Sequence, residues 1–223
     1  MRSIRAILKY GLLLPVCQVV GTAWHELIGH GLVGAAFGGR IVWIKLLGFR
    51  VWPHFYWDGW EGYGAIDLAG ITSRTGERLM ELGGSASTWL VSVAAIGLLW
   101  LRRWRRPGRV HRPGRGWPRV ILILLGLWWI DLFTYTLPTW GLRRSILWGG
   151  TKSEPYEAAI ALGVPGWLFQ AFVVVSSIAL ATAWVVGIVR DRSKSALQIS
   201  NNSSKSENAG AGSSEATGSE PRA

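Results

Sequence analysis

The chain has 223 residues, of which 49% are hydrophobic and 17% are charged, and it contains 15 Trp and one Cys. This composition is typical of an integral membrane protein rather than of a soluble domain. A single cysteine excludes an intramolecular disulfide and a cysteine-based zinc site. The formal net charge is +11, but eight arginines fall between Arg102 and Arg119, between two apolar segments. Such a cluster favours a role in topology and contact with anionic lipid head groups over nucleic-acid binding.

Four apolar segments are each long enough to cross a bilayer, which requires about 20 helical residues. We therefore expect an α-helical polytopic membrane protein with four spans, at about residues 7–37, 80–101, 120–137 and 167–189. The first segment is too long for a straight span and is expected to tilt or break near its glycines. Residues 1–190 would form the membrane-embedded domain, and the polar residues 191–223 a disordered tail.

Basic residues before the first span, between the second and third, and after the fourth lie on one side of a four-span protein. This side is predicted to be cytoplasmic, in a bacterial inner membrane, with both termini on it. The first 20 residues also resemble a signal peptide. We favour an uncleaved span, because cleavage near Ala23 would leave the following helix without its anchor.

Residues 40–67 do not have a helical pattern. Residues 41–44 and 49–52 are strand-like, and Asp58-Gly59 is a hairpin turn signal. These features predict a small β-hairpin at the membrane face.

The sequence His25-Glu-Leu-Ile-Gly-His30 lies inside the first apolar segment. Two imidazoles and a carboxylate are costly at membrane depth, so they indicate a functional site. Two His flanking a Glu are typical of a zinc site with its own general base. His25 and His30 would ligate Zn²⁺, and Glu26 would deprotonate its bound water. The alternative is that the two His pack against neighbouring backbone.

The spacing of this motif makes a geometric demand on its helix. The usual zinc motif places its His four residues apart, whereas here they are five apart, about 140° around an ideal α-helix. The motif can bind a metal only if the helix contains an extra residue, as in a π-bulge. Gly29 is the expected place for this distortion.

Residues 25–41, HELIGHGLVGAAFGGRI, resemble the conserved first helix of the site-2 protease superfamily of intramembrane zinc metallopeptidases. In that family a His-Glu-Leu-Gly-His core leads through small residues to a Phe-Gly-Gly-Arg-Val-like exit and a membrane-associated β-structure. The inserted residue departs from the family and instead resembles the His-Glu-x-x-Gly-His motif of the soluble dipeptidyl peptidase III family. Gly83-Gly84-Ser85 resembles the family's small-residue helix-packing segment.

The resemblance also implies a third, carboxylate ligand from a later helix, usually in a Leu-Asp-Gly motif that this chain lacks. Glu154, in a loop before Pro155, is the first candidate, and Asp131 within the third span is the alternate. Their other possible roles are stabilising a helix dipole and hydrogen bonding to a neighbouring helix, respectively. Glu157, His54 and Asp67 remain further candidates.

The expected function is that of a membrane-embedded zinc endopeptidase acting on membrane-protein or peptide substrates. One rival is an inactive relative that holds zinc or a membrane partner. The other is a small transporter, against which the lack of repeated halves counts.

Overall fold

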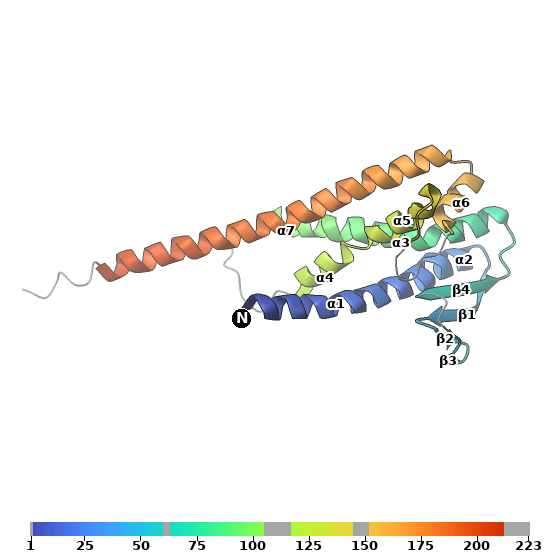
Figure 1. The fold of residues 1–223 in the computed structure, drawn as a ribbon, viewed down its shortest axis with the longest axis horizontal. Coiled ribbons are helices and arrows are strands. Elements are labelled where there is room, and N and C mark those ends of the chain that lie inside the picture. Colours follow the sequence, from blue (N-terminus) through green and yellow to red (C-terminus); the bar gives the residue numbers. More distant parts are fainter. Residues whose placement is uncertain (1, 60–62, 105–116, 145–151, 212–223) are drawn as a thin grey trace, which may run out of the picture.

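The computed structural model describes the backbone at residues 2–59, 63–104, 117–144 and 152–211, and the side chains at 13–59, 63–101, 117–144 and 152–188. It is a helical bundle with a small antiparallel sheet at one end (Figure 1). The elements are α1 (Arg2–Trp24), the π-helix η1 (His25–Leu32), α2 (Val33–Ala36), β1 (Arg40–Leu46), β2 (Phe49–Trp52), β3 (Tyr56–Trp57), β4 (Gly64–Ala69), α3 (Arg74–Trp104), α4 (Trp117–Leu125), α5 (Trp129–Thr136), the 3₁₀-helix η2 (Leu137–Trp140), α6 (Glu154–Ala161) and α7 (Gly166–Ala211).

Three helical segments of the described chain are long and apolar enough to cross a membrane: Arg74–Leu101, Trp117–Trp140 and Gly166–Ile188. They correspond to the second, third and fourth expected spans. The expected first span is the continuous helical run of α1, η1 and α2, which is not among these three. Its distortion is a π-helical stretch rather than a break.

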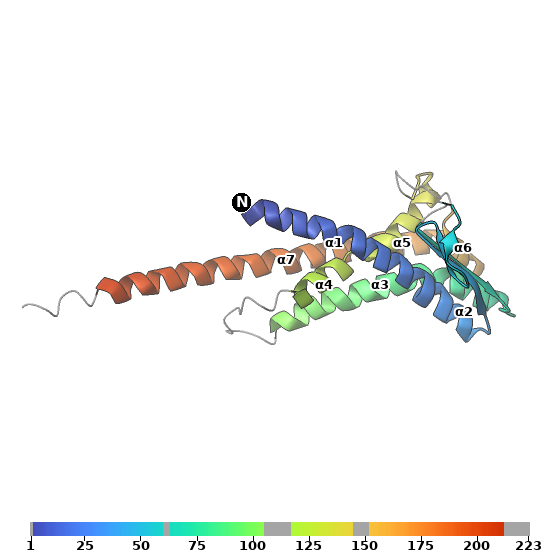
Figure 2. The same cartoon turned by 90° about the horizontal axis from the view of Figure 1, so that it is seen from below.

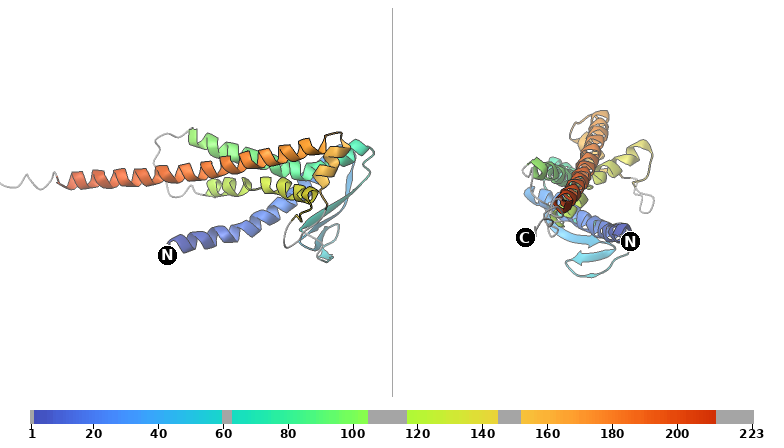
Figure 3. Two further views of the ribbon diagram at one scale, coloured as in Figure 1. Left: turned by 45° about the horizontal axis from the view of Figure 1, so that its top comes forward. Right: turned by 90° about the vertical axis from the view of Figure 1, so that its left-hand side faces the viewer.

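Basic residues were expected on one side of the membrane before the first span, between the second and third, and after the fourth. The helix ends next to these basic residues lie at one end of the bundle. The start of α1, the end of α3 and the start of α4 lie there, and α7 runs in the same direction (Figures 1 and 3). The sheet, α2 and α6 lie at the opposite end. This is the arrangement that the expected topology requires, and the side of a membrane that each end faces stays a prediction.

The sheet has the strand order β3-β2-β1-β4, so the expected hairpin is the centre of a larger element. The turn expected at Asp58-Gly59 was wrong. The two-residue turn is Leu47-Gly48, between the paired residues Leu46 and Phe49, and both turn residues have positive φ. Asp58 follows β3 instead, where Arg50 donates two hydrogen bonds to its carboxylate, at 3.2 and 3.0 Å. The β2–β3 region exposes a set of aromatic side chains: Phe49, Trp52, Phe55, Tyr56 and Trp57.

The tail also differs from the expectation, because α7 continues as one helix to Ala211. Residues 191–211 contain no proline and only one glycine, Gly210, and extending an existing helix is easier than nucleating a new one. Residues 212–223, the remainder of the expected disordered tail, lie outside the described residues.

The third span is not a single α-helix. Between α4 and α5 the backbone tightens, and Leu127, Trp128, Ile130 and Asp131 each donate to the carbonyl three residues earlier. Side chains of other helices donate hydrogen bonds to carbonyl oxygens at this irregularity. Trp184 Nε1 donates to Ile123 O at 2.9 Å, Ser92 Oγ to Gly126 O at 2.7 Å, and Cys17 Sγ to Leu124 O at 3.6 Å.

Glycines let η1 and α3 cross in backbone contact (Figure 2). A Cβ added at Gly29 would overlap the Cα of Gly84, and one added at Gly83 would lie 2.5 Å from the carbonyl oxygen of Gly29. The close packing expected for the Gly83-Gly84 segment is therefore present, and its partner is the helix that carries the His-Glu motif.

We predict that Gly29→Ala lowers the stability of the detergent-purified protein, because a methyl group at this crossing forces the two helices apart. Overpacking of this kind costs about 1–3 kcal/mol. Thermal unfolding followed by circular dichroism measures the effect. Gly97→Ala, on the exposed side of α3 with open space around it, is the matched control and should leave the midpoint unchanged or raise it. Equal midpoints for the two variants would contradict the crossing.

Candidate metal centre

The π-helical geometry of η1 brings the two histidines of the motif together. Residues five apart are neighbours along a π-helix, and the Nε2 atoms of His25 and His30 lie 3.1 Å apart. Both side chains are buried, with 4% and 6% of their surface exposed. The widening of the helix that the spacing demanded is confirmed.

The Nδ1 atom of each ring donates a hydrogen bond to an oxygen atom elsewhere in the bundle. His30 Nδ1 lies 2.7 Å from the carbonyl oxygen of Met80, which can only accept, so this nitrogen is the donor. His25 Nδ1 lies 2.8 Å from Asp131 Oδ2 and donates to the carboxylate. In the neutral rings, both Nε2 atoms are then unprotonated, and their lone pairs meet at 3.1 Å. Two such lone pairs repel each other unless a proton or a metal ion lies between the two nitrogens.

The spacing of the nitrogens fits a zinc ion. Two imidazole ligands of one tetrahedral zinc, each at 2.0–2.1 Å, lie about 3.3 Å apart. Space for the ion is provided by Gly84 of α3, because a Cβ there would press against the Nε2 atoms of both His. The residues present therefore fit two ligands of a zinc site.

Asp131 contacts the Nδ1 atom of His25, on the side of the ring away from the Nε2 atom that faces His30. Its Oδ2 accepts hydrogen bonds from His25 Nδ1 and, at 2.9 Å, from Thr88 Oγ1 of α3. A carboxylate on the outer nitrogen of a histidine ligand fixes its tautomer and orientation and raises its basicity. The tightened backbone between α4 and α5 places Asp131 on the face of α5 that turns toward η1. The structure thus puts this residue, the alternate third ligand, in an orienting position.

Glu26, the neighbour of His25 in the chain, is also buried, with 6% of its surface exposed. Its carboxylate lies against Gly64 of β4, where an added Cβ would come within 2.9 Å of Oε1. It interacts electrostatically with His25 and Asp131. Gly64 has no side chain, so the edge strand β4 leaves room for the carboxylate of Glu26, the expected general base.

The third ligand stays a prediction. Glu154 is the first residue of α6, is half-buried, and interacts electrostatically with Glu26 and Tyr135. Ser153 Oγ donates to the carbonyl oxygen of Tyr135 and so ties the start of α6 to α5. Within the described ranges, no group of three His, Cys, Asp or Glu side chains is arranged to hold a metal. The further candidates Glu157, His54 and Asp67 are all exposed.

The sequence analysis missed Tyr135, whose Oη lies 3.4 Å from His25 Nε2. Its ring stacks on that of His25, with 5.3 Å between centroids and 10° between planes. The guanidinium carbon of Arg144 lies 3.0 Å from the centroid of the Tyr135 ring. One feature of the sequence could have pointed to Tyr135. It lies four residues after Asp131, so the two residues share a helix face.

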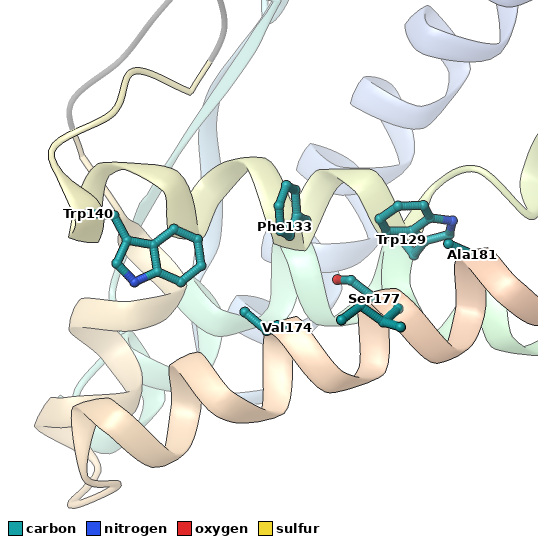
Figure 4. A pocket seen from close by; sticks show the side chains of 7 residues that line it. Trp129, Phe133, Trp140, Val174, Ser177 and Ala181 are labelled. Atoms are coloured by element: carbon teal, nitrogen blue, oxygen red, sulfur yellow. The ribbon is translucent and has the colours of Figure 1, made fainter.

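The other face of α5 borders an apolar groove between α5, η2 and α7 (Figure 4). Its volume is about 420 Å³. Trp129 and Phe133 lie on this face, about half a helical turn away from Asp131 and Tyr135. The groove is therefore separate from the metal centre. Its lining consists of Trp129, Phe133, Trp140, Val174, Ser177, Ile178 and Ala181.

No protein-family model, curated protein or solved structure matches the chain.

We predict that Asp131→Asn weakens zinc binding by about 10- to 100-fold, because the neutral amide no longer supports the His25 imidazole as a ligand. Competition with a chromogenic chelator measures the dissociation constant. Asp67→Asn, on the exposed side of β4, is the control and should bind zinc like the unmodified protein. Unchanged affinity in Asp131→Asn would contradict the orienting role.

Proposed function

We propose that this chain is a membrane-embedded zinc-dependent endopeptidase that cleaves peptide bonds of membrane-associated substrates. His25 and His30 would hold the zinc ion, Glu26 would act as general base, and Glu154 would complete the ligand set. The observation that carries this proposal is the pair of Nε2 atoms 3.1 Å apart, both rings being anchored through Nδ1, with a buried glutamate next to them.

The donor set favours zinc or another transition metal over magnesium and calcium. Imidazole nitrogen suits zinc, whereas magnesium and calcium prefer sites built from oxygen ligands. When bound, a catalytic zinc ion lowers the pKa of its water and polarises the carbonyl of the scissile bond. Two His and one carboxylate are among the ligand sets of catalytic zinc sites.

Glu26 would move the protons of the reaction. One Oε atom accepts a proton from the attacking water as the water oxygen forms its bond with the carbonyl carbon. The same carboxyl then gives this proton to the amide nitrogen as the C–N bond breaks. The products are one carboxylic acid and one amine, and Glu26 returns to its ionised form.

Two features support a location in the bilayer. Three described helices have the length and apolar character of spans. Carbonyls along the irregular backbone of the third accept hydrogen bonds from Cys17, Ser92 and Trp184, side chains of other helices. Backbone of this kind is tolerated at membrane depth only where such partners are present. The His-Glu motif lies at the end of the bundle near the sheet, where a substrate segment leaving the bilayer would pass (Figure 1).

We predict that Glu26→Gln keeps about one zinc per chain but loses at least about 100-fold in kcat, because the amide accepts no proton from water. Zinc-loaded protein in detergent is assayed on a quenched-fluorescence library of apolar peptides, with metal content measured by mass spectrometry. Glu157→Gln, an exposed residue of the same type, is the control. Equal hydrolysis by the Glu26→Gln variant and its parent would contradict the peptidase. Full zinc loading without hydrolysis in either would favour the inactive zinc-holding relative.

A further inference from the structure

Tyr135 places its phenol hydroxyl near the nitrogen of His25 that would bind the metal. Its Oη is 3.4 Å from His25 Nε2, the nitrogen that faces His30, while Asp131 on the same helix engages the outer nitrogen of His25. Two residues on one face of α5 thus contact the two nitrogens of the His25 ring. The residue is buried, with 7% of its surface exposed, so its hydroxyl competes little with bulk water.

The stacking of the two rings decides where the hydroxyl points. The planes are 10° from parallel, and stacked rings cannot approach closer than van der Waals contact. With the rings in this relation, an Oη at 3.4 Å from Nε2 lies over the face of the imidazole. It does not lie in line with the lone pair in the ring plane. The phenol therefore flanks the position to which Nε2 points instead of occupying it.

Several contacts hold the phenol in this place. The ring is stacked on His25, and the Arg144 guanidinium lies against it, 3.0 Å from its centroid to Cζ. The backbone of Tyr135 is fixed by the hydrogen bond from Ser153 at the start of α6. Arg144 also interacts electrostatically with His25 and Asp131. A hydroxyl donor is thus held beside His25 Nε2, and a positive charge lies against the ring that carries it.

We propose that Tyr135 is a further catalytic residue, which donates its phenolic hydrogen to the carbonyl oxygen of the scissile bond as that oxygen becomes negative. This inference rests on the proposed peptidase function. The hydrogen remains on Oη throughout, so the step is hydrogen bonding without proton transfer. A preorganised donor of this kind is worth about 100- to 1,000-fold in kcat.

The test uses Tyr135→Phe, which keeps the aromatic ring and removes only the hydroxyl. The control is Tyr156→Phe, on α6, where the ring packs against Phe169. The full-length protein in detergent is measured for zinc content, for kcat and KM on the peptide library, and, after cobalt substitution, for acetohydroxamate affinity by visible absorption. This probe offers a carbonyl oxygen to the same donor and requires no turnover.

We expect Tyr135→Phe to keep one metal per chain and its cobalt spectrum, to lose about 100-fold or more in kcat with a nearly unchanged KM, and to bind acetohydroxamate about 10-fold more weakly. Loss of the metal would overturn the inference by making Tyr135 a ligand or a structural residue. Unchanged kcat and probe affinity would overturn it while leaving the peptidase intact. If Glu26→Gln shows that the peptidase proposal is wrong, the probe affinity still decides whether the phenol is a donor at the metal centre.

Discussion

The candidate site depends on one departure from α-helical geometry, the π-helix from His25 to Leu32. In an α-helix the two histidines would lie about 140° apart around the axis and would point to different faces. The π-helix brings these atoms within 3.1 Å. It also puts Gly29 at the crossing with α3, where only glycines allow the two backbones to touch and where Gly84 leaves space beside both nitrogens.

A second departure lies in the third expected span, and residues of that segment, Asp131 and Tyr135, contact His25 of the first. The tightened backbone between α4 and α5 aims Asp131 at His25 Nδ1. Carbonyls at this irregularity accept hydrogen bonds from side chains of α1, α3 and α7, so most of the bundle supports it. Local rules of helix geometry are thus broken in two places, both of them in contact with His25. Functional sites are where such violations are expected.

The sequence predicted those features that local patterns determine. Hydropathy located three helices that are long and apolar enough to cross a membrane, and the spacing of His25 and His30 required the widened helix, since two metal ligands must share a face. It did not predict which residues meet through tertiary contacts. Asp131 was weighed as a ligand because a carboxylate at membrane depth is conspicuous, but its hydrogen bond to Nδ1 depends on a helix irregularity with no sequence signature other than Gly126. The spacing of four residues places Tyr135 on the same helix face as Asp131, but only the structure shows that this face meets His25.

The most direct test of this account is the zinc content of the detergent-purified protein, prepared without chelators and supplied with zinc. The metal centre predicts about one zinc per chain in the unmodified protein and its loss in both His25→Ala and His30→Ala. His54→Ala, an exposed histidine between β2 and β3, should keep the metal. No zinc in the unmodified protein, or equal zinc in all three variants, would contradict the account and leave His25 and His30 as a hydrogen-bonded pair within the bundle.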